Sequence, residues 1–179
     1  MPLIRPSVDD DLDAITRIYA HHVLHGTGTF ETTPPSMQDM TGRRADVLGK
    51  GLPWLVLEED ARVLGFAYGN WFKPRPAYRF SVEDSIYMAP EAAGKGWGKA
   101  LLAELLAALE RGGVRKVMAV IGDSANTGSI GVHRALGFER VGVVESCGWK
   151  FDRWLDIVLM QKTIGAGDSA PPVDAGGQA

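Results

Sequence analysis

The sequence contains a single cysteine, Cys147, among its 179 residues, so a disulfide within the chain is excluded. This scarcity of cysteine fits a reducing compartment. No His or Asn motif of a thiol enzyme flanks the residue. We therefore interpret Cys147 as a small apolar strand residue rather than a nucleophile.

Long apolar runs and an excess of one charge are also missing. No run approaches the ~18–20 apolar residues of a membrane span, and the first residues lack the apolar core of a signal peptide. The formal net charge of -3 gives no sign of the basic face that nucleic acid or an anionic membrane would favour. We expect a soluble cytoplasmic protein with a small-molecule substrate and no nucleic-acid or membrane partner.

What is present is the pattern of one α/β domain, because apolar residues alternate in some segments and recur at helical spacing in others. The segment order β α α β β β α β α β β predicts a central mixed sheet flanked by helices. Residues after about 163 are mostly Gly, Ala, Pro, Asp and Ser, so we expect a domain at 1–162 and a disordered tail at 163–179. Strands are expected at 3–5, 54–57, 63–71, 78–88, 117–121, 138–145 and 149–161, and helices at about 9–25, 36–50, 100–111 and 126–136.

A glycine-rich loop separates the fourth predicted strand from the third predicted helix. Such a loop exposes unpaired N–H groups and the positive end of the helix, which together suit a phosphate group. It is no P-loop, because three residues separate Gly94 from Gly98 and Ala100 replaces the hydroxyl residue, and it misses the Rossmann spacing. Taken alone, it fits a flexible turn as well. Its residues are Gly94, Lys95, Gly96, Trp97, Gly98 and Lys99.

The loop is followed by a leucine-striped helix, an apolar strand and the segment Asn126-x-x-Ser129-Ile130-x-Val132-His133-x-x-Leu136-Gly137-Phe138. In this context the chain resembles the GCN5-related N-acetyltransferase superfamily. The acetyl-CoA loop of that superfamily usually begins with Arg or Gln, whereas Ala93 stands at that place here. The resemblance implies acetyl-CoA as co-substrate, held in part by a strand that splays from its parallel neighbour. We expect no metal, because no ligand cluster surrounds His21, His22 and His25, for which surface or loop roles are expected.

Six separated blocks narrow the resemblance to the phosphinothricin and methionine-sulfoximine acetyltransferases over residues 3–162. That family implies direct acetyl transfer to the amine of an amino-acid-like acceptor in a ternary complex, by an enzyme that is commonly a homodimer. The blocks are Pro53-Trp54-Leu55-Val56, Lys73-x-Arg75-x-Ala77-Tyr78, Glu83-x-Ser85-Ile86-Tyr87, Ala119-Val120-Ile121-Gly122, His133-x-Ala135-Leu136-Gly137-Phe138 and Trp154-x-Asp156.

The strand before the glycine loop carries the candidate base. Phe80, Val82, Ile86 and Met88 alternate onto one face, and Ser81, Glu83, Ser85 and Tyr87 onto the other. The resemblance places the general base at Glu83, and it implies that backbone groups of Ile86, Tyr87 and Met88 hold the acetyl carbonyl and the pantetheine. Periodicity alone favours a solvated or salt-bridged glutamate.

Two residues of the following segment have alternative roles. His133 stands where many superfamily members carry a tyrosine acid, so it is a candidate to protonate the leaving thiolate. The alternatives are that it helps to deprotonate the amine, or that it only packs or bonds to the cofactor. Asn126 is a candidate helix cap and, by resemblance, a ligand of the pantetheine amides.

The acceptor site is expected at Lys73, Arg75 and Tyr78, because an Arg fork suits a carboxylate or a phosphinate. A solvated hairpin with two cations is the alternative. The resemblance adds Phe30 as a substrate-loop aromatic, and Glu31 beside it leaves the choice of acceptor open. Two other functions remain: acetylation of a different amine (an amino acid, a polyamine or a peptide) and a non-catalytic acyl-CoA-binding module, which Ala93 favours and Glu83 and His133 oppose.

Overall fold

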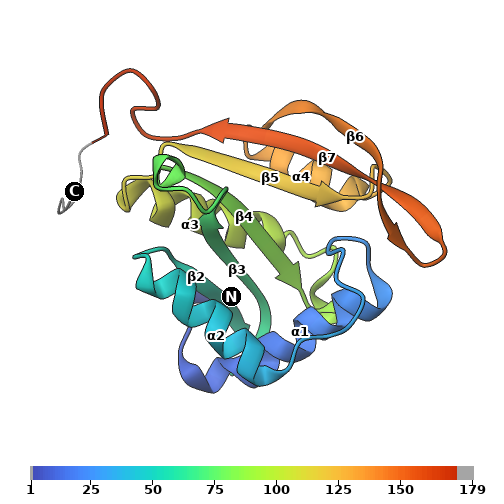
Figure 1. Ribbon diagram of the computed structural model, residues 1–179. Helices are drawn as coiled ribbons and strands as arrows, with labels where there is room; N and C mark the ends of the chain where they lie inside the picture. Colours follow the sequence, from blue (N-terminus) through green and yellow to red (C-terminus); the bar gives the residue numbers. More distant parts are fainter. Residues whose placement is uncertain (1, 173–179) are drawn as a thin grey trace.

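A single mixed sheet of seven strands organises the protein (Figure 1). The structure is a computed structural model that describes residues 2–172, so residues 173–179 of the predicted tail lie outside the described part. The order across the sheet is β1-β2-β3-β4-β5-β7-β6. The strands are β1 (Leu3–Pro6), β2 (Trp54–Glu59), β3 (Arg62–Trp71), β4 (Ser81–Met88), β5 (Lys116–Gly122), β6 (Glu139–Lys150) and β7 (Arg153–Thr163).

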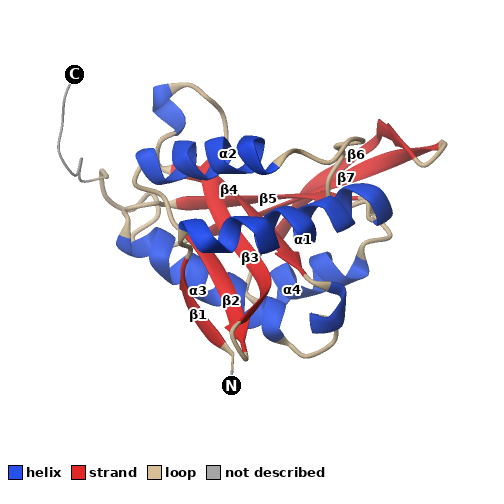
Figure 2. Ribbon diagram, turned by 90° about the horizontal axis from the view of Figure 1, so that it is seen from below, coloured by secondary structure: helices blue, strands red, loops and turns tan. Residues whose placement is uncertain are grey.

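Four α-helices cover the two faces of this sheet in the described chain. They are α1 (Leu12–His25), α2 (Met37–Gly49), α3 (Trp97–Arg111) and α4 (Thr127–Ala135). Figure 2 shows α1 and α2 over one face and α3 and α4 over the other. The order of elements confirms the predicted α/β architecture, and it follows from simple local signals. The leucine stripe of α3 is buried as predicted: Leu101, Leu102, Leu105, Leu106 and Leu109.

The sheet contains one parallel pair, β4 with β5, and this pair separates early. Its ladder comprises Ser81–Lys116, Val82–Val117 and Glu83–Met118, after which the two strands diverge. Beyond that point β5 continues to pair with β7 as far as Gly122, and β4 continues to pair with β3. We call the opening between the diverging strands the fork. It is the splayed pair that the family resemblance predicted.

Two predicted strand boundaries differ from the structure. β4 begins at Ser81 rather than Tyr78, because Pro76–Tyr78 form a 3₁₀ turn with proline at its first position. The last hairpin turns at Phe151–Asp152 rather than near residues 146–148. Both turn residues have φ of 54°, whereas Ser146, at φ 51°, belongs to an irregular stretch within β6.

The expected disorder does not start at residue 163. Thr163 ends β7, and the buried Ile164 joins the apolar core. The Ile164 N–H donates to the carbonyl of Arg115, and two turns follow up to Ser169. One apolar side chain in a polar stretch is enough to anchor this segment, which composition alone did not reveal.

Candidate active site

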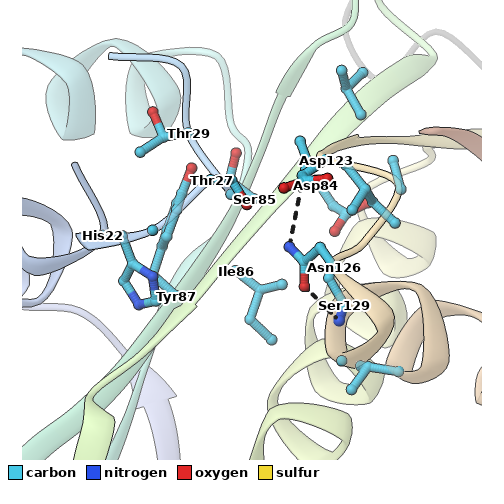
Figure 3. A pocket seen from close by; sticks show the side chains of 18 of the residues that line it. His22, Thr27, Thr29, Asp84, Ser85, Ile86, Tyr87, Asp123, Asn126 and Ser129 are labelled. Carbon is cyan, nitrogen blue, oxygen red and sulfur yellow. Dashed lines mark hydrogen bonds between the residues drawn. The ribbon is translucent and has the colours of Figure 1, made fainter. Parts of the chain in front are cut away.

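A cavity of about 740 Å³ opens at the fork, where β4 and β5 have separated (Figure 3). Its walls come from α1, the loop at residues 26–30, β4, β5, and the start of α4. The arrangement brings together residues that the sequence scatters over more than a hundred positions. The predicted site residues that line it are Phe30, Glu83, Ile86, Tyr87, Met88, Gly98, Asn126 and His133.

The glycine loop delivers the N-terminus of α3 to this cavity. Gly94 and Gly96 both have φ of 75° with open space where a side chain would begin, so the chain can turn there and a ligand can approach its backbone. Gly98 lies against β4, since a Cβ there would be 3.6 Å from Cγ of Met88. The first N–H groups of α3 have no partner within the helix, which makes this end a suitable anion site.

The rest of the loop lies beyond the cavity wall. Lys95 is exposed, and its Nζ lies 4.3 Å from the ring centroid of Trp97. Lys99 is also exposed, in the first turn of α3. These places suit the phosphate end of acetyl-CoA. The β4 edge past Glu83, with no ladder to β5, offers free backbone groups to the amides of its pantetheine arm.

Glu83 is the carboxylate at the point where the fork begins. It pairs with Asn70 of β3 and Met118 of β5 at the last rung before the strands separate. Burial and then the charge of Asp84 raise the pKa of Glu83 to about 6, against the opposing charge of Lys73. A carboxylate with this pKa is still ionised at neutral pH and is a better proton acceptor than an ordinary glutamate.

Three tyrosines line the same side of the cavity as Glu83. Tyr19 meets Tyr87 edge to face with ring centroids 4.9 Å apart, and Tyr68 is stacked on Trp54 at 4.0 Å. Burial raises the pKa of Tyr19 to about 12 and that of Tyr87 well above its usual value. Both phenols therefore remain protonated at neutral pH.

Glu31 is committed to a network behind the cavity rather than to its interior. Arg43 binds it with both terminal nitrogens, at 2.6 and 3.1 Å, and the Tyr19 hydroxyl donates to it at 2.8 Å. The hydrogen bonds with Arg43 and Tyr19 outweigh burial and lower the pKa of Glu31. Glu31 thus anchors the loop against α1 and α2, a role that its sequence position did not reveal.

Phe30 and the loop around it are fixed from β6. The Phe30 ring packs against Gly122 and Gly148, where any side chain would overlap it or the loop backbone. Lys150 is buried, and its Nζ donates to the carbonyls of Gly26 and Thr29, both at 2.8 Å. Burial lowers the pKa of Lys150. This role was not predicted from the sequence, because the lysine lies between the exposed aromatic residues Trp149 and Phe151 of the last hairpin.

Two histidines contact β4 from opposite faces of the sheet. His22, for which a surface or loop role was expected, instead lines the cavity, and its Nε2 lies 2.8 Å from the carbonyl oxygen of Met88. The expectation was wrong because one turn of α1 faces the strand. Burial lowers the pKa of His22. His133 is almost fully buried, and its Nε2 lies 2.9 Å from Oδ2 of Asp84, for which no role was predicted from the sequence.

Asn126 caps α4 from the cavity wall. Its side-chain oxygen accepts from the Ser129 N–H at 3.2 Å, and its nitrogen donates to the Gly122 carbonyl at 3.4 Å (Figure 3). Both bonds are with the protein, so the expected cap is present. The residue also lines the cavity, where a pantetheine arm would pass.

Lys73, Arg75 and Tyr78 do not reach the cavity wall. All three are exposed on the segment before β4, and the Tyr78 ring contacts Phe72 at a centroid distance of 6.1 Å. Lys73 is near enough for its charge to act on Glu83. Among the described residues, no group of three or more His, Cys, Asp or Glu side chains is arranged to hold a metal. No helix in residues 2–172 is long and apolar enough to cross a membrane.

The family of this fold and site is shown by comparison with known proteins. The model of the acetyltransferase (GNAT) family matches residues 16–138. The chain belongs to the GNAT acetyltransferase family. A phosphinothricin N-acetyltransferase of Alcaligenes faecalis is 52% identical over 169 residues, which cover 94% of this chain and 86% of the relative.

Two further relatives place this GNAT protein more closely. An L-methionine sulfoximine/L-methionine sulfone acetyltransferase of Pseudomonas aeruginosa is 37% identical, with 94% of this chain and 98% of the relative covered. The crystal structure of a GNAT superfamily phosphinothricin acetyltransferase from Sinorhizobium meliloti, in complex with AcCoA, superposes with a TM-score of 0.94 at 45% identity. It covers 97% of this chain and 94% of that chain. The predicted family and fold are confirmed.

Proposed function

We propose that this GNAT protein transfers the acetyl group of acetyl-CoA to the amine of a small amino-acid-like acceptor of the phosphinothricin, methionine sulfoximine or methionine sulfone type. The observation that carries the proposal is the ionised, half-buried Glu83 at the point where the fork begins, in one cavity with the free edge of β4 and the N-terminus of α3. The activities for which the Alcaligenes and Pseudomonas relatives are named support the acceptor class.

The geometry supports a direct transfer in a ternary complex. Glu83 takes the proton of the acceptor ammonium, directly or through a water molecule, and the amine nitrogen then bonds to the thioester carbonyl carbon. The carbon–sulfur bond breaks with its electron pair on sulfur, the nitrogen gives up its second proton to water, and coenzyme A leaves as a thiolate. An N–H of the free β4 edge at Ile86 to Met88, aimed at the carbonyl oxygen as it gains charge, contributes about 3 kcal/mol of transition-state stabilisation.

The acceptor occupies the side of the cavity nearest Phe30 in this proposal. Tyr68 and Tyr87 lie there as protonated phenols, suited to donate to a carboxylate, a phosphinate or a sulfone oxygen, whereas the Tyr19 hydroxyl donates to Glu31. Lys73 and Arg75 then act from outside the wall, as exposed cations that attract the anionic acceptor to the entrance, and Tyr78 lies exposed on the same segment.

Thiol release from acetyl-CoA tests the proposal. The panel comprises phosphinothricin, methionine sulfoximine, methionine sulfone, ordinary amino acids, polyamines and a peptide amine. We expect turnover with the first three at a kcat/KM at least tenfold above the others. Turnover restricted to polyamines or peptides would contradict the acceptor class, and acetyl-CoA binding without turnover on any amine would favour a non-catalytic acyl-CoA-binding module.

We also propose a cytoplasmic homodimer, whose catalytic domain extends past the predicted residue 162 to include Thr163 of β7 and the core residue Ile164. The tip of the β6–β7 hairpin supports the dimer, because it exposes Trp149 at 55% and Trp154 at 60%, with ring centroids 5.2 Å apart. Aromatic residues so exposed are typical of interfaces. Sedimentation of the wild type and of Trp154→Glu tests it, and we expect a dimer and a monomer respectively. A wild type that sediments as a monomer at all concentrations would contradict the dimer.

A further inference from the structure

Asp84 is an acidic residue on the face of β4 that faces the apolar side of the sheet. It alternates with Val82 and Ile86, and its side chain is 1% exposed. It is also the first β4 residue beyond the last rung of the parallel ladder, Glu83–Met118. His133 enters from α4 at this point, with Nε2 2.9 Å from Oδ2 of Asp84 and a side-chain exposure of 3%. An acid–imidazole pair is therefore buried where the fork begins.

Both nitrogens of His133 face hydrogen-bond acceptors. Nδ1 lies 2.7 Å from the carbonyl oxygen of Ser129, which can only accept, so Nδ1 carries a hydrogen. Nε2 faces the Asp84 carboxylate, which accepts when it is ionised. A neutral imidazole has one N–H and satisfies one of these partners, whereas an imidazolium satisfies both.

The surroundings of the ring favour the charged form. β4 supplies Asp84, α4 supplies the carbonyl and hydroxyl of Ser129, and the segment after α4 supplies Phe138, whose ring centroid is 4.9 Å away. Of these groups only Asp84 is ionisable. Burial by itself lowers the pKa of His133, but the hydrogen bond and charge of Asp84, with the bond to Ser129, outweigh burial and raise it.

We propose that Asp84 is a positioning residue that holds His133 as a doubly protonated imidazolium, so that His133 is a fixed positive charge at the fork and not the base of the reaction. This inference rests on the proposed acetyl transfer. The amine proton passes to Glu83, because His133 has no lone pair to accept it. The electron pair of the carbon–sulfur bond goes to sulfur, the imidazolium stabilises the resulting thiolate, and solvent protonates the thiolate on release.

The protonation state of His133 is measurable without any acceptor. The full chain is labelled with ¹⁵N-histidine, and the His133 signals, among four histidines, are assigned with a His133→Gln variant. We expect both ring nitrogens of wild-type His133 to remain protonated from pH 6 to pH 8. One unprotonated ring nitrogen at pH 7 would overturn the proposal, because the His133 ring would then be neutral.

Asp84→Asn separates positioning from simple packing. An asparagine amide can donate to Nε2, so the variant keeps a hydrogen bond but favours a neutral ring. We expect the ring to be neutral at pH 7 and kcat to fall about 100-fold, with the KM for acetyl-CoA within about threefold of wild type. Asp13→Asn, an exposed site on α1, is the control and should leave kcat unchanged.

A double-mutant cycle completes the test. If Asp84 acts through His133, Asp84→Asn costs less than about threefold in kcat when His133 is already Gln. An equal loss in both backgrounds would overturn the positioning role. The wild-type spectrum needs no variant, so it decides the protonation state even where Asp84→Asn fails to fold. Spectra as expected, with no amine acetylated, would leave the charged pair intact and contradict the proposed function alone.

Discussion

The two walls of the cavity are built by different means. On the side to which we assign acetyl-CoA, here called the cofactor wall, the defining features are local. The turns at Gly94 and Gly96 start α3, and Asn126 caps α4 through Ser129, three residues later. On the side nearest Phe30, to which we assign the acceptor and which we call the acceptor wall, the defining contacts are distant in sequence. Lys150 binds the carbonyl of Gly26, 124 positions away. A wall built from contacts that are local in sequence can be recognised from its motif. A wall built from contacts between distant residues can be recognised only in the folded structure. Mutations should distinguish the two walls by which substrate they affect.

The largest effect is expected between the walls, at Glu83. Glu83→Gln removes the proton acceptor, so kcat should fall about 10²- to 10⁴-fold while the affinity for acetyl-CoA stays near that of wild type. Steady-state kinetics and calorimetric titration with acetyl-CoA measure the two quantities. Retained turnover would remove Glu83 as the base.

The same substitution should stabilise the fold at pH 8. The folded pKa of about 6 exceeds the ordinary 4.5, so the folded state favours protonated Glu83, and its ionisation above pH 6 costs at most about 2 kcal/mol of unfolding free energy. Thermal melts of both proteins at pH 5 and pH 8 check this sign. A higher Tm for Glu83→Gln than for the wild type at pH 5 but not at pH 8 would contradict this sign.

Gly148→Ala should perturb the acceptor wall selectively. The new methyl group would overlap the Phe30 ring, and relieving such overpacking costs about 1–3 kcal/mol. We expect the KM for the acceptor to rise roughly tenfold or more and the KM for acetyl-CoA to stay unchanged. Gly142→Ala in the same strand, where a Cβ meets nothing within 4 Å, is the matched control. Equal changes in both KM values would show that the walls are not independent.

Gly96→Ala should perturb the cofactor wall in the same selective way. At φ of 75° an alanine is strained by about 1–2 kcal/mol, which corresponds to roughly a tenfold increase in the KM for acetyl-CoA. The KM for the acceptor should stay within about twofold. Gly42→Ala in α2, with open space around its Cβ, serves as the control. A larger effect on the acceptor than on acetyl-CoA would break the comparison.

Lys73→Ala should have the smallest effect, and it acts from outside both walls. The charge of Lys73 lowers the pKa of Glu83, so its removal raises that pKa. Wild-type kcat/KM should fall as the pH drops through about 6, and in the variant this fall should begin at a slightly higher pH. Profiles of kcat/KM from pH 5 to pH 8.5 measure the shift, and a move toward lower pH would contradict the assignment of Glu83.

Much of the fold could be predicted from sequence because its signals are periodic. The alternation in β4 separates Glu83, Ser85 and Tyr87 from Val82, Ile86 and Met88, and the structure turns Tyr87 toward Tyr19 but Met88 and Ile86 toward Gly98. The hairpin turn was misplaced because non-glycine residues, Phe151 and Asp152, occupy its positive-φ positions, where a glycine would have marked it.

The parts of the site that escaped prediction are polar groups whose partners are far away. Asp84 interrupts an apolar face, which was a visible irregularity, but its partner His133 lies 49 positions further along the chain. Lys150 follows Trp149 in an exposed hairpin, where a lysine is ordinarily solvated. Neither composition nor periodicity contains such pairings, since they depend on how distant elements pack.

The position of Lys150 has a thermodynamic consequence for the hairpin. Its backbone belongs to β6 between the exposed Trp149 and Phe151, while its ammonium group binds the loop that carries Phe30. A binding event that shifted this strand would also shift the loop, so occupation of the hairpin surface and occupation of the proposed acceptor site would be linked equilibria. If a ligand of the hairpin changed the affinity for the acceptor by some factor, the acceptor would change the affinity for that ligand by the same factor.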